Sequence, residues 1–114
     1  DMGMVKRGDL VIILTKSGST AESVYLAEQL SKREGVNLWL LTFKQHSVLS
    51  ERLKSLVLNL EHEGDMWNIM PNNSTTLNLI VLQSLAMNIA KKMGLTLEDF
   101  KPNHPGGAIG VQLK

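Results

Sequence analysis

Short runs of apolar residues alternate with longer stretches in which apolar and polar positions repeat. The first run, residues 10–14, has five consecutive apolar side chains, and residues 36–43 and 55–60 form two further runs rich in strand-forming residues. Runs of this length between polar flanks are typical of strands that helices cover on both faces of a parallel sheet. The pattern therefore predicts three buried parallel strands.

Helices are predicted between these strands. Residues 19–34 carry apolar side chains close to a 3.6-residue period, and the pattern stops at Gly35. Residues 47–54 are predicted to form a short helix. Its inward-facing side chains are expected to be Val48, Leu49 and Leu53.

A loop and a longer helix are predicted after the third strand. Residues 61–73 contain turn-forming residues and indicate a loop. From Ser74 to Met93 the pattern is helical again, and it ends at Gly94. Apolar residues surround most of this helix, as expected if it is central in the domain or buried in a subunit interface.

The alternation of strands and helices predicts an α/β domain with a parallel sheet. The chain has 114 residues, of which 43% are hydrophobic, and this is enough to build one core. We therefore expect a single domain over residues 1–114. Ligands of such sheets bind at the carboxyl ends of the strands, so candidate site residues are sought in the loops that follow them.

Composition narrows the classes of function. The 12 Lys and Arg residues nearly balance the 11 Asp and Glu residues and form no basic run, which disfavours nucleic-acid binding. The absence of cysteine excludes disulfides and thiolate metal sites and fits a reducing compartment, so a cytoplasmic location is expected. No membrane span or signal peptide is visible, because the most apolar stretch, residues 77–90, is short and interrupted.

The loop after the first predicted strand is rich in hydroxyl groups. These belong to Thr15, Ser17, Ser19 and Thr20 and surround Gly18 at the start of a predicted helix. Free N–H groups and the helix dipole favour an anion there, and a phosphate monoester would fit. Lys16 could add a positive charge or could point to solvent. No Gly-Lys-Ser/Thr follows at the spacing that a nucleoside-triphosphate loop requires.

Helix capping is the alternative interpretation of this loop. Ser19 followed three residues later by Glu22 fits a capping box. Capping needs only one hydroxyl, however, and the segment holds four. We therefore favour a phosphate-binding loop.

Two glutamates and one histidine are candidates for chemistry at this edge of the sheet. Glu22 lies on the first helical turn, where it could reach the ligand or only cap the helix. Glu63 follows the third predicted strand, although its spacing alone favours a solvated loop acid. His104 is followed by Pro105 and two glycines, and these constraints fit a catalytic residue and a structural turn equally well. His46 and His62 have no second metal ligand at a suitable spacing and are assigned no function.

Three segments resemble one known family. "LTKSGSTAE", residues 14–22, resembles the strand and phosphate loop of the sugar isomerase (SIS) domain, with Thr15 and Lys16 departing from its usual residues. "NNSTT", residues 72–76, is similar to the start of its long helix. "GLTLEDFKPNHPGGAIG", residues 94–110, is similar to a block of the arabinose 5-phosphate isomerase branch. The similarity extends over essentially the whole chain.

This resemblance implies a fold and a set of site residues. The fold would be a three-layer αβα sandwich with a parallel, flavodoxin-like sheet. The catalytic residues would be Glu22, Glu63 and His104, and the phosphate-binding hydroxyls would be those of Thr15, Ser17 and Thr20, with Ser19 where the family often has an acid. The first strand of the family, its first phosphate loop and a His-Gly-Asp segment would precede Asp1, so the chain is expected to be an N-terminally trimmed domain. Paired CBS modules would follow it in many relatives.

The activity implied by the resemblance is the isomerisation of D-ribulose 5-phosphate to D-arabinose 5-phosphate. A glutamate would move a proton between C1 and C2 through an enediolate, and either Glu22 or Glu63 could do so. His104 could move protons on the oxygens or open the sugar ring. No metal or organic cofactor is expected. The protein would be a homo-oligomer, a tetramer or a dimer, in which the tail bearing His104 reaches a neighbouring site. Two alternatives stay open: a phosphosugar sensor without turnover, and an isomerase of another sugar phosphate.

Overall fold

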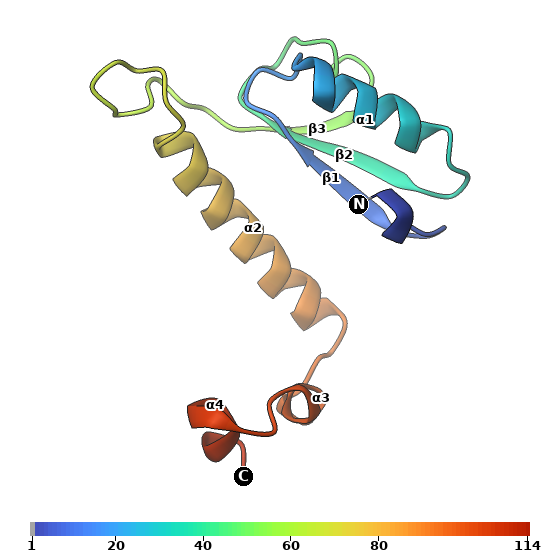
Figure 1. Ribbon diagram of the computed structural model, residues 1–114, viewed down its shortest axis with the longest axis vertical. Coiled ribbons are helices and arrows are strands. Elements are labelled where there is room, and N and C mark those ends of the chain that lie inside the picture. The colour runs from blue at the N-terminus through green and yellow to red at the C-terminus, as the bar shows by residue number, and fades with distance from the viewer. Residues whose placement is uncertain (1) are drawn as a thin grey trace. The chain divides into compact units, whose positions relative to one another are not determined.

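Three parallel strands form the sheet. β1 (Leu10–Leu14), β2 (Asn37–Thr42) and β3 (Lys54–Val57) lie in the order β1-β2-β3 (Figure 1). All three predicted strands are therefore present, although the third ends at Val57 instead of residue 60. Because the strands are parallel, their carboxyl ends lie at one edge of the sheet, where the predicted phosphate loop and the segment before Glu63 begin. The predicted α/β class with a parallel sheet is confirmed.

The computed structural model describes residues 2–114, which divide into two compact units. The first unit extends to Asn78 and contains the short 3-10 helix Met2–Met4, the sheet and helix α1 (Ala21–Ser31). The second unit begins at Leu79. Helix α2 (Asn73–Lys92) starts in the first unit and continues into the second. Each unit is described by itself.

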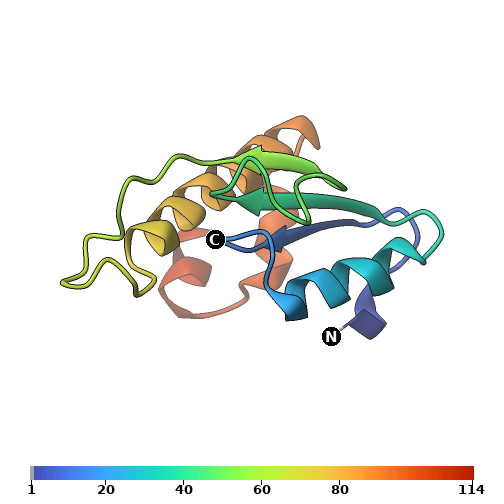
Figure 2. The same ribbon diagram turned by 90° about the horizontal axis from the view of Figure 1, so that it is seen from above.

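Helix α1 covers one face of the sheet (Figure 2). The core between them consists of Ile13, Ala27, Leu40 and Leu49, with Val11, Val24 and Leu53 packed against it. The register pairs Ile13 with Leu40, so both side chains point to the same face and meet α1. This packing fixes the direction in which α1 leaves the hydroxyl-rich loop.

The strands are less buried than predicted. Leu10 and Leu14, at the two ends of β1, are 48% and 43% exposed, and Leu56 of β3 is 46% exposed. Within the first unit β3 is an edge strand, and the residues of β1 alternate between the face covered by α1 and the opposite face. The prediction of strands covered on both faces is therefore wrong for these positions.

The short helix predicted at 47–54 is absent and is replaced by turns. The Ser47 N–H donates to the Ser50 hydroxyl at 2.7 Å, and the Ser50 N–H donates to the Ser47 hydroxyl at 3.1 Å. This reciprocal pattern is that of a capping box and starts a single turn, in which the Leu53 N–H donates to Leu49 O at 2.9 Å, but β3 begins at Lys54 before the turn can lengthen into a helix. Leu49 is buried as predicted, whereas Val48 is 42% exposed and does not face inward.

Helix α2 was predicted to within one residue at each end, and the loop predicted at residues 61–73 is present but extends from residue 58 to residue 72. Much of the apolar surface of α2 is exposed, with Leu79, Ile80 and Met87 all more than half exposed. Among the described residues, no helix is long and apolar enough to cross a membrane. The expected role of α2 in a subunit interface stays a prediction.

The tail of the second unit consists of short helical segments: α3 (Leu97–Phe100), a 3-10 turn (Lys101–Asn103) and α4 (Gly107–Gln112). The ring of His104 stacks on that of Phe100, with centroids 3.9 Å apart. The backbone N–H of His104 donates to Lys101 O at 3.0 Å. A side chain at Gly110 would lie 2.8 Å from the carbonyl oxygen of His104. The histidine is therefore held in an ordered turn.

Candidate functional site

Three hydroxyl groups converge in the loop between β1 and α1. Thr15 Oγ1 lies 3.4 Å from Thr20 Oγ1, and Ser17 Oγ lies 3.3 Å from the same atom. The Ser19 hydroxyl is used differently, because it accepts a hydrogen bond from the Val48 N–H at 3.4 Å. It keeps its own proton to donate. The loop thus presents a cluster of neutral donors next to the start of a helix.

The capping box of Ser19 and Glu22, the alternative interpretation of this loop, does not form. Helix α1 begins at Ala21, and its N-cap is Thr20, whose side chain makes no capping hydrogen bond. The backbone ladder of the helix starts with the Val24 N–H, which donates to Thr20 O at 3.0 Å. The N–H groups of the first turn, residues 21–23, precede this bond and point out of the helix end. The hydroxyls and these N–H groups are together available to an anion.

Gly18 fixes the shape of the loop. It has a φ of +65°, a conformation that side-chain-bearing residues rarely adopt. A Cβ at this position would lie only 2.7 Å from the Cβ of Ser47 and still closer to its hydroxyl. The carbonyl of Gly18 also accepts from the Leu49 N–H at 3.0 Å. The serine-rich turn after β2 therefore supports the hydroxyl-rich loop.

Residues at the end of β2 hold the backbone of Lys16 by hydrogen bonds. Its carbonyl oxygen accepts from the Phe43 N–H at 3.2 Å and from the hydroxyl of Thr42, also at 3.2 Å. Thr42 is fully buried at the end of β2. The main chain of Lys16 is thus fixed, while its side chain is 46% exposed.

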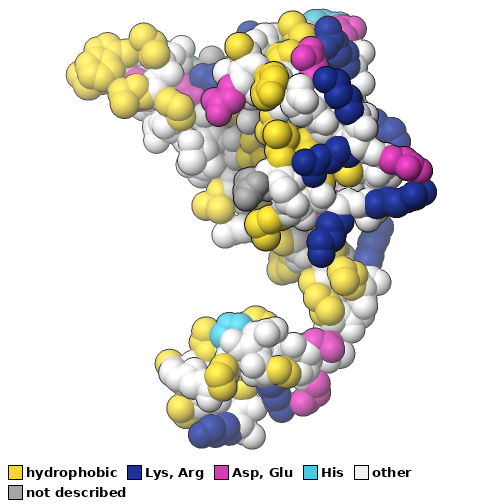
Figure 3. All heavy atoms as spheres, turned by 45° about the vertical axis from the view of Figure 1, so that its right-hand side comes forward, with side chains coloured by type: hydrophobic (Ala, Val, Ile, Leu, Met, Phe, Trp, Pro, Cys, Tyr) yellow, Lys and Arg dark blue, Asp and Glu magenta, His cyan; other side chains and the backbone are white. Residues whose placement is uncertain are grey.

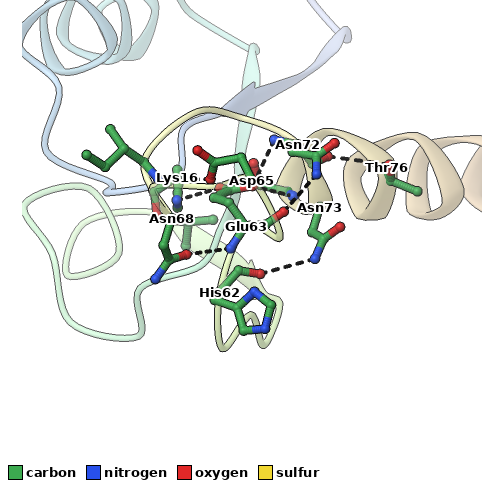
Figure 4. A network of polar contacts seen from close by, with 11 residues as sticks. Lys16, His62, Glu63, Asp65, Asn68, Asn72, Asn73 and Thr76 are labelled. Carbon is green, nitrogen blue, oxygen red and sulfur yellow. Dashed lines mark hydrogen bonds and ion pairs between the residues drawn. The ribbon is translucent and has the colours of Figure 1, made fainter.

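Glu63 is the most buried charged residue of the first unit, with 0% of its side chain exposed. One carboxylate oxygen, Oε2, accepts hydrogen bonds from the N–H groups of Asn72 at 2.9 Å and Ser74 at 3.0 Å (Figure 4). The other, Oε1, forms an ion pair with the ammonium group of Lys16. The interpretation of Glu63 as a solvated loop acid is therefore wrong.

These contacts keep Glu63 ionised. The Lys16 ammonium, followed by the Ser74 N–H, lowers the pKa of the Glu63 carboxyl from 4.5 to about 2, against the opposing effect of burial. A carboxyl with this pKa is a carboxylate throughout the physiological pH range. The site thus holds a buried negative charge beside a positive one.

The segment between Glu63 and α2 folds back on the backbone of Glu63. Asn68, with a φ of +56°, uses its side-chain oxygen to accept from the Glu63 N–H at 2.6 Å. The Glu63 carbonyl accepts from the side chain of Asn72 and from the N–H of Asn73, both at 3.0 Å. Both polar groups of the Glu63 backbone are therefore fixed by the loop that follows it.

The same segment carries exposed apolar side chains, which gather on the loop that protrudes from the sheet (Figure 3). They are Met66, Trp67, Ile69 and Met70, which are between 54% and 83% exposed. The carboxylate of Asp65 accepts from the N–H groups of Trp67 and Ile69, at 3.2 Å and 3.0 Å, and orders the loop. The surface next to Glu63 is therefore apolar and structured.

Sequence reasoning missed three contributors to this site. It left the direction of Lys16 open, and it treated Asn72 as part of a turn and of a helix start and Asn68 as part of a loop. The one signal that could have suggested the two asparagines was the recurrence of Asn after the acids of this loop, since Asn tolerates positive φ and bonds to nearby backbone. Their convergence on Glu63 depends on the three-dimensional path of the loop.

The remaining predicted residues lie in two places. Glu22 is in the first turn of α1, directly after the hydroxyl cluster, and its carboxylate has no hydrogen-bond or ion-pair partner among the described residues. His104 belongs to the second unit, where its Nδ1 lies 3.3 Å from Phe100 O. Within the first unit, the structure brings together Lys16, Glu63 and the hydroxyl-rich loop. No three His, Asp or Glu side chains within residues 2–114 are grouped to hold a metal ion.

Known proteins are similar to this chain over nearly all of its length. It is 40% identical to the arabinose 5-phosphate isomerase KdsD of Pseudomonas aeruginosa and 35% identical to KdsD of Escherichia coli K12, in each case over 99% of the chain. It covers only 35% and 34% of those two proteins. The chain thus spans about a third of the length of the curated relatives it matches.

Solved structures share the fold. A protein of E. coli CFT073 in complex with arabinose 5-phosphate has a TM-score of 0.83 and 32% sequence identity, over 92% of this chain and 56% of that one. A Listeria monocytogenes structure has a TM-score of 0.82 at 24% identity, over 92% of this chain and 55% of that one, and supports the fold alone. The model of the SIS domain matches residues 1–88. On the strength of this match, the chain belongs to the SIS domain family.

Proposed function

We propose that this chain is part of a phosphosugar aldose–ketose isomerase, with D-ribulose 5-phosphate and D-arabinose 5-phosphate as its substrate and product. The observation that carries the proposal is the buried carboxylate of Glu63, which Lys16 connects to a loop suited to a phosphate. The names of the relatives, and the sugar phosphate in the complex from E. coli CFT073, support this choice of substrate.

The hydroxyl-rich loop is proposed to hold the phosphate. Thr15, Ser17 and Thr20 would donate their hydroxyl protons to phosphate oxygens, and the N–H groups of the first turn of α1 would complete the site. Ser19 can donate as well, because its bond with Val48 uses only a lone pair. The phosphate is remote from C1 and C2, where the reaction occurs. The free energy of binding the phosphate would therefore hold these two carbons in the geometry that the reaction requires.

Proton transfer between C1 and C2 is proposed for a carboxylate. Glu63 is fixed at both its backbone and its Oε2, whereas Glu22 has no fixed partner among the described residues, so Glu63 is the better-positioned base. Removing the proton from one carbon would leave an enediolate, and returning it to the other would complete the isomerisation. Glu22 and His104 would transfer protons to and from the hydroxyl and carbonyl oxygens of the sugar, or catalyse the opening of its ring.

A homo-oligomer is proposed as the active form. His104 lies in the second unit, on an ordered turn, and the exposed apolar residues of α2 offer a surface for another subunit. In this arrangement the tail of one subunit would supply His104 to the site of its neighbour.

The proposal is tested by replacing Glu63 in the longest natural form of the protein. Glu63→Gln is expected to lower kcat for ribulose 5-phosphate by about 10²- to 10⁴-fold, the range typical of general acid–base groups, while the Kd for arabinose 5-phosphate does not rise. Glu61→Gln, two residues away on an exposed side chain, is the matched control and should leave both unchanged. The two constants come from a coupled isomerase assay and from calorimetry.

A phosphosugar sensor is the second candidate. The low pKa of Glu63, about 2, favours it, because a carboxylate of that pKa is a weak proton acceptor. Tight binding of arabinose 5-phosphate without any turnover in the complete protein would support the sensor and contradict the isomerase.

A further inference from the structure

The ion pair between Lys16 and Glu63 joins the two functional parts of the first unit. Lys16 is a residue of the hydroxyl-rich loop, between Thr15 and Ser17, whereas Glu63 follows β3. The Lys16 ammonium is close to Oε1 of Glu63 and projects from a backbone that Phe43 and Thr42 hold in place. A ligand on the loop and a proton on the carboxylate would therefore both affect this one cation.

Glu63 does not depend on Lys16 for its position. Oε2 keeps its two bonds from the Asn72 and Ser74 N–H groups, and the backbone of Glu63 keeps its bonds to the loop, when Oε1 loses its partner. Oε1 has no other hydrogen-bond partner among the described residues. Departure of the ammonium would thus leave a fixed carboxylate with one free oxygen.

Lys16 has the freedom for such a change. Its side chain is 46% exposed, and a lysine stem carries its charge through several rotatable bonds. A phosphate bound by the hydroxyl cluster would bring one to about two negative charges to the same loop, depending on pH. It would compete with a single buried carboxylate for the ammonium group.

We infer that Lys16 is a positioning residue that couples occupancy of the phosphate loop to the basicity of Glu63, an inference that rests on the proposed function. A phosphate on the loop attracts the Lys16 ammonium, and Oε1 of Glu63 becomes available to accept a proton. The carboxylate stays in place on the Asn72 and Ser74 N–H groups. Proton abstraction is thereby confined to molecules that carry a phosphate.

The coupling resolves a conflict within the site. While the ammonium stays on Oε1, the carboxylate is stabilised in its ionised form and accepts a proton poorly. Its proton affinity rises when the opposite charge moves away. Three other ionisable side chains lie close to Glu63 in the sequence. The Asp65 carboxylate accepts from N–H groups of its own loop. Among the described residues, Glu61 and His62 make no contact with the Glu63 carboxylate. Lys16 is the cation in direct contact.

The test follows the carboxyl carbon of Glu63 by NMR between about pH 3 and 7, with Glu63→Gln used to assign the signal and inorganic phosphate as the probe. Without phosphate the signal should not titrate above about pH 3.5, because the pKa is about 2. With saturating phosphate the midpoint should move up into the window, toward the ordinary value of 4.5.

Variants of Lys16 complete the test. In Lys16→Met the carboxyl should titrate within the window with or without phosphate, and Lys16→Arg should restore the low midpoint. Lys32→Met, which removes the same charge at the other end of α1, is the matched control and should behave like the unmodified protein.

The possible results distinguish among the coupling, the phosphate site and the proposed reaction. A midpoint that phosphate does not move, although calorimetry shows phosphate bound, overturns the coupling and leaves the phosphate site intact. A failure to bind phosphate at all overturns both the coupling and the proposed site. A midpoint that responds to phosphate in a protein without isomerase activity supports the coupling and rejects only the proposed reaction.

Discussion

At the scale of single residues, glycine and asparagine permit backbone conformations that the site needs. Gly18 turns the chain at a φ of +65° against the side chain of Ser47, and Asn68 turns it at +56° beside Glu63. The sequence shows Gly18 as part of a loop motif, but the close approach of Ser47 could not be predicted. It depends on how the turn after β2 folds, and the helix predicted there does not form.

The cost of a side chain at Gly18 is the first prediction at this scale. Gly18→Ala should lower the free energy of unfolding by about 1–2 kcal/mol, because alanine is strained at a positive φ. The clash between the new Cβ and Ser47 should lower it further. Gly8→Ala is the matched control, since Gly8 also has a positive φ but has no atom within 4 Å of an added Cβ. Urea unfolding of both variants measures the difference, and equal losses would show that the contact with Ser47 carries no cost.

At the scale of elements, apolar runs and helical periodicity predict the strands and the two longer helices well. The failures have local physical reasons. Strand β3 begins at Lys54, so the turn that Ser47 and Ser50 start cannot lengthen into the predicted short helix. The burial of Glu63 could not be derived from spacing, because its partners are Lys16, far earlier in the chain, and N–H groups nine and eleven residues later. The catalytic role that the resemblance implies for Glu63 stays a prediction.

The loop between β3 and α2 gives the prediction at this scale. Asn68→Gly keeps the positive φ but leaves the Glu63 N–H without its acceptor, at a cost of about 1–3 kcal/mol in the free energy of unfolding. Asn68→Ala should cost about 1–2 kcal/mol more, because it adds backbone strain. Urea unfolding compares the two variants. If they are equally stable, the backbone conformation of Asn68 contributes nothing measurable, and if Asn68→Gly matches the unmodified protein, the hydrogen bond contributes nothing.

At the scale of the whole molecule, the proposed site residues are distributed over two compact units. The phosphate loop and Glu63 belong to the first unit, and His104 belongs to the second. The expectation that the chain is a single domain lacking its first strand stays a prediction, as does the expectation of a shared active site. The ordered turn that holds His104 against Phe100 is consistent with a histidine that must be presented at a defined place.

Sharing of sites between subunits can be tested with two variants that are each inactive. Glu63→Gln would remove the proposed base, and His104→Gln would remove the proposed proton carrier of the tail. If the tail of one subunit completes the site of its neighbour, an oligomer that contains both variants has some sites with an intact Glu63 and an intact His104. Unfolding and refolding the two proteins together should therefore restore isomerase activity that neither variant has alone. Activity in the mixture no greater than in either variant would place His104 and Glu63 of the same subunit in one site, or remove His104 from the reaction.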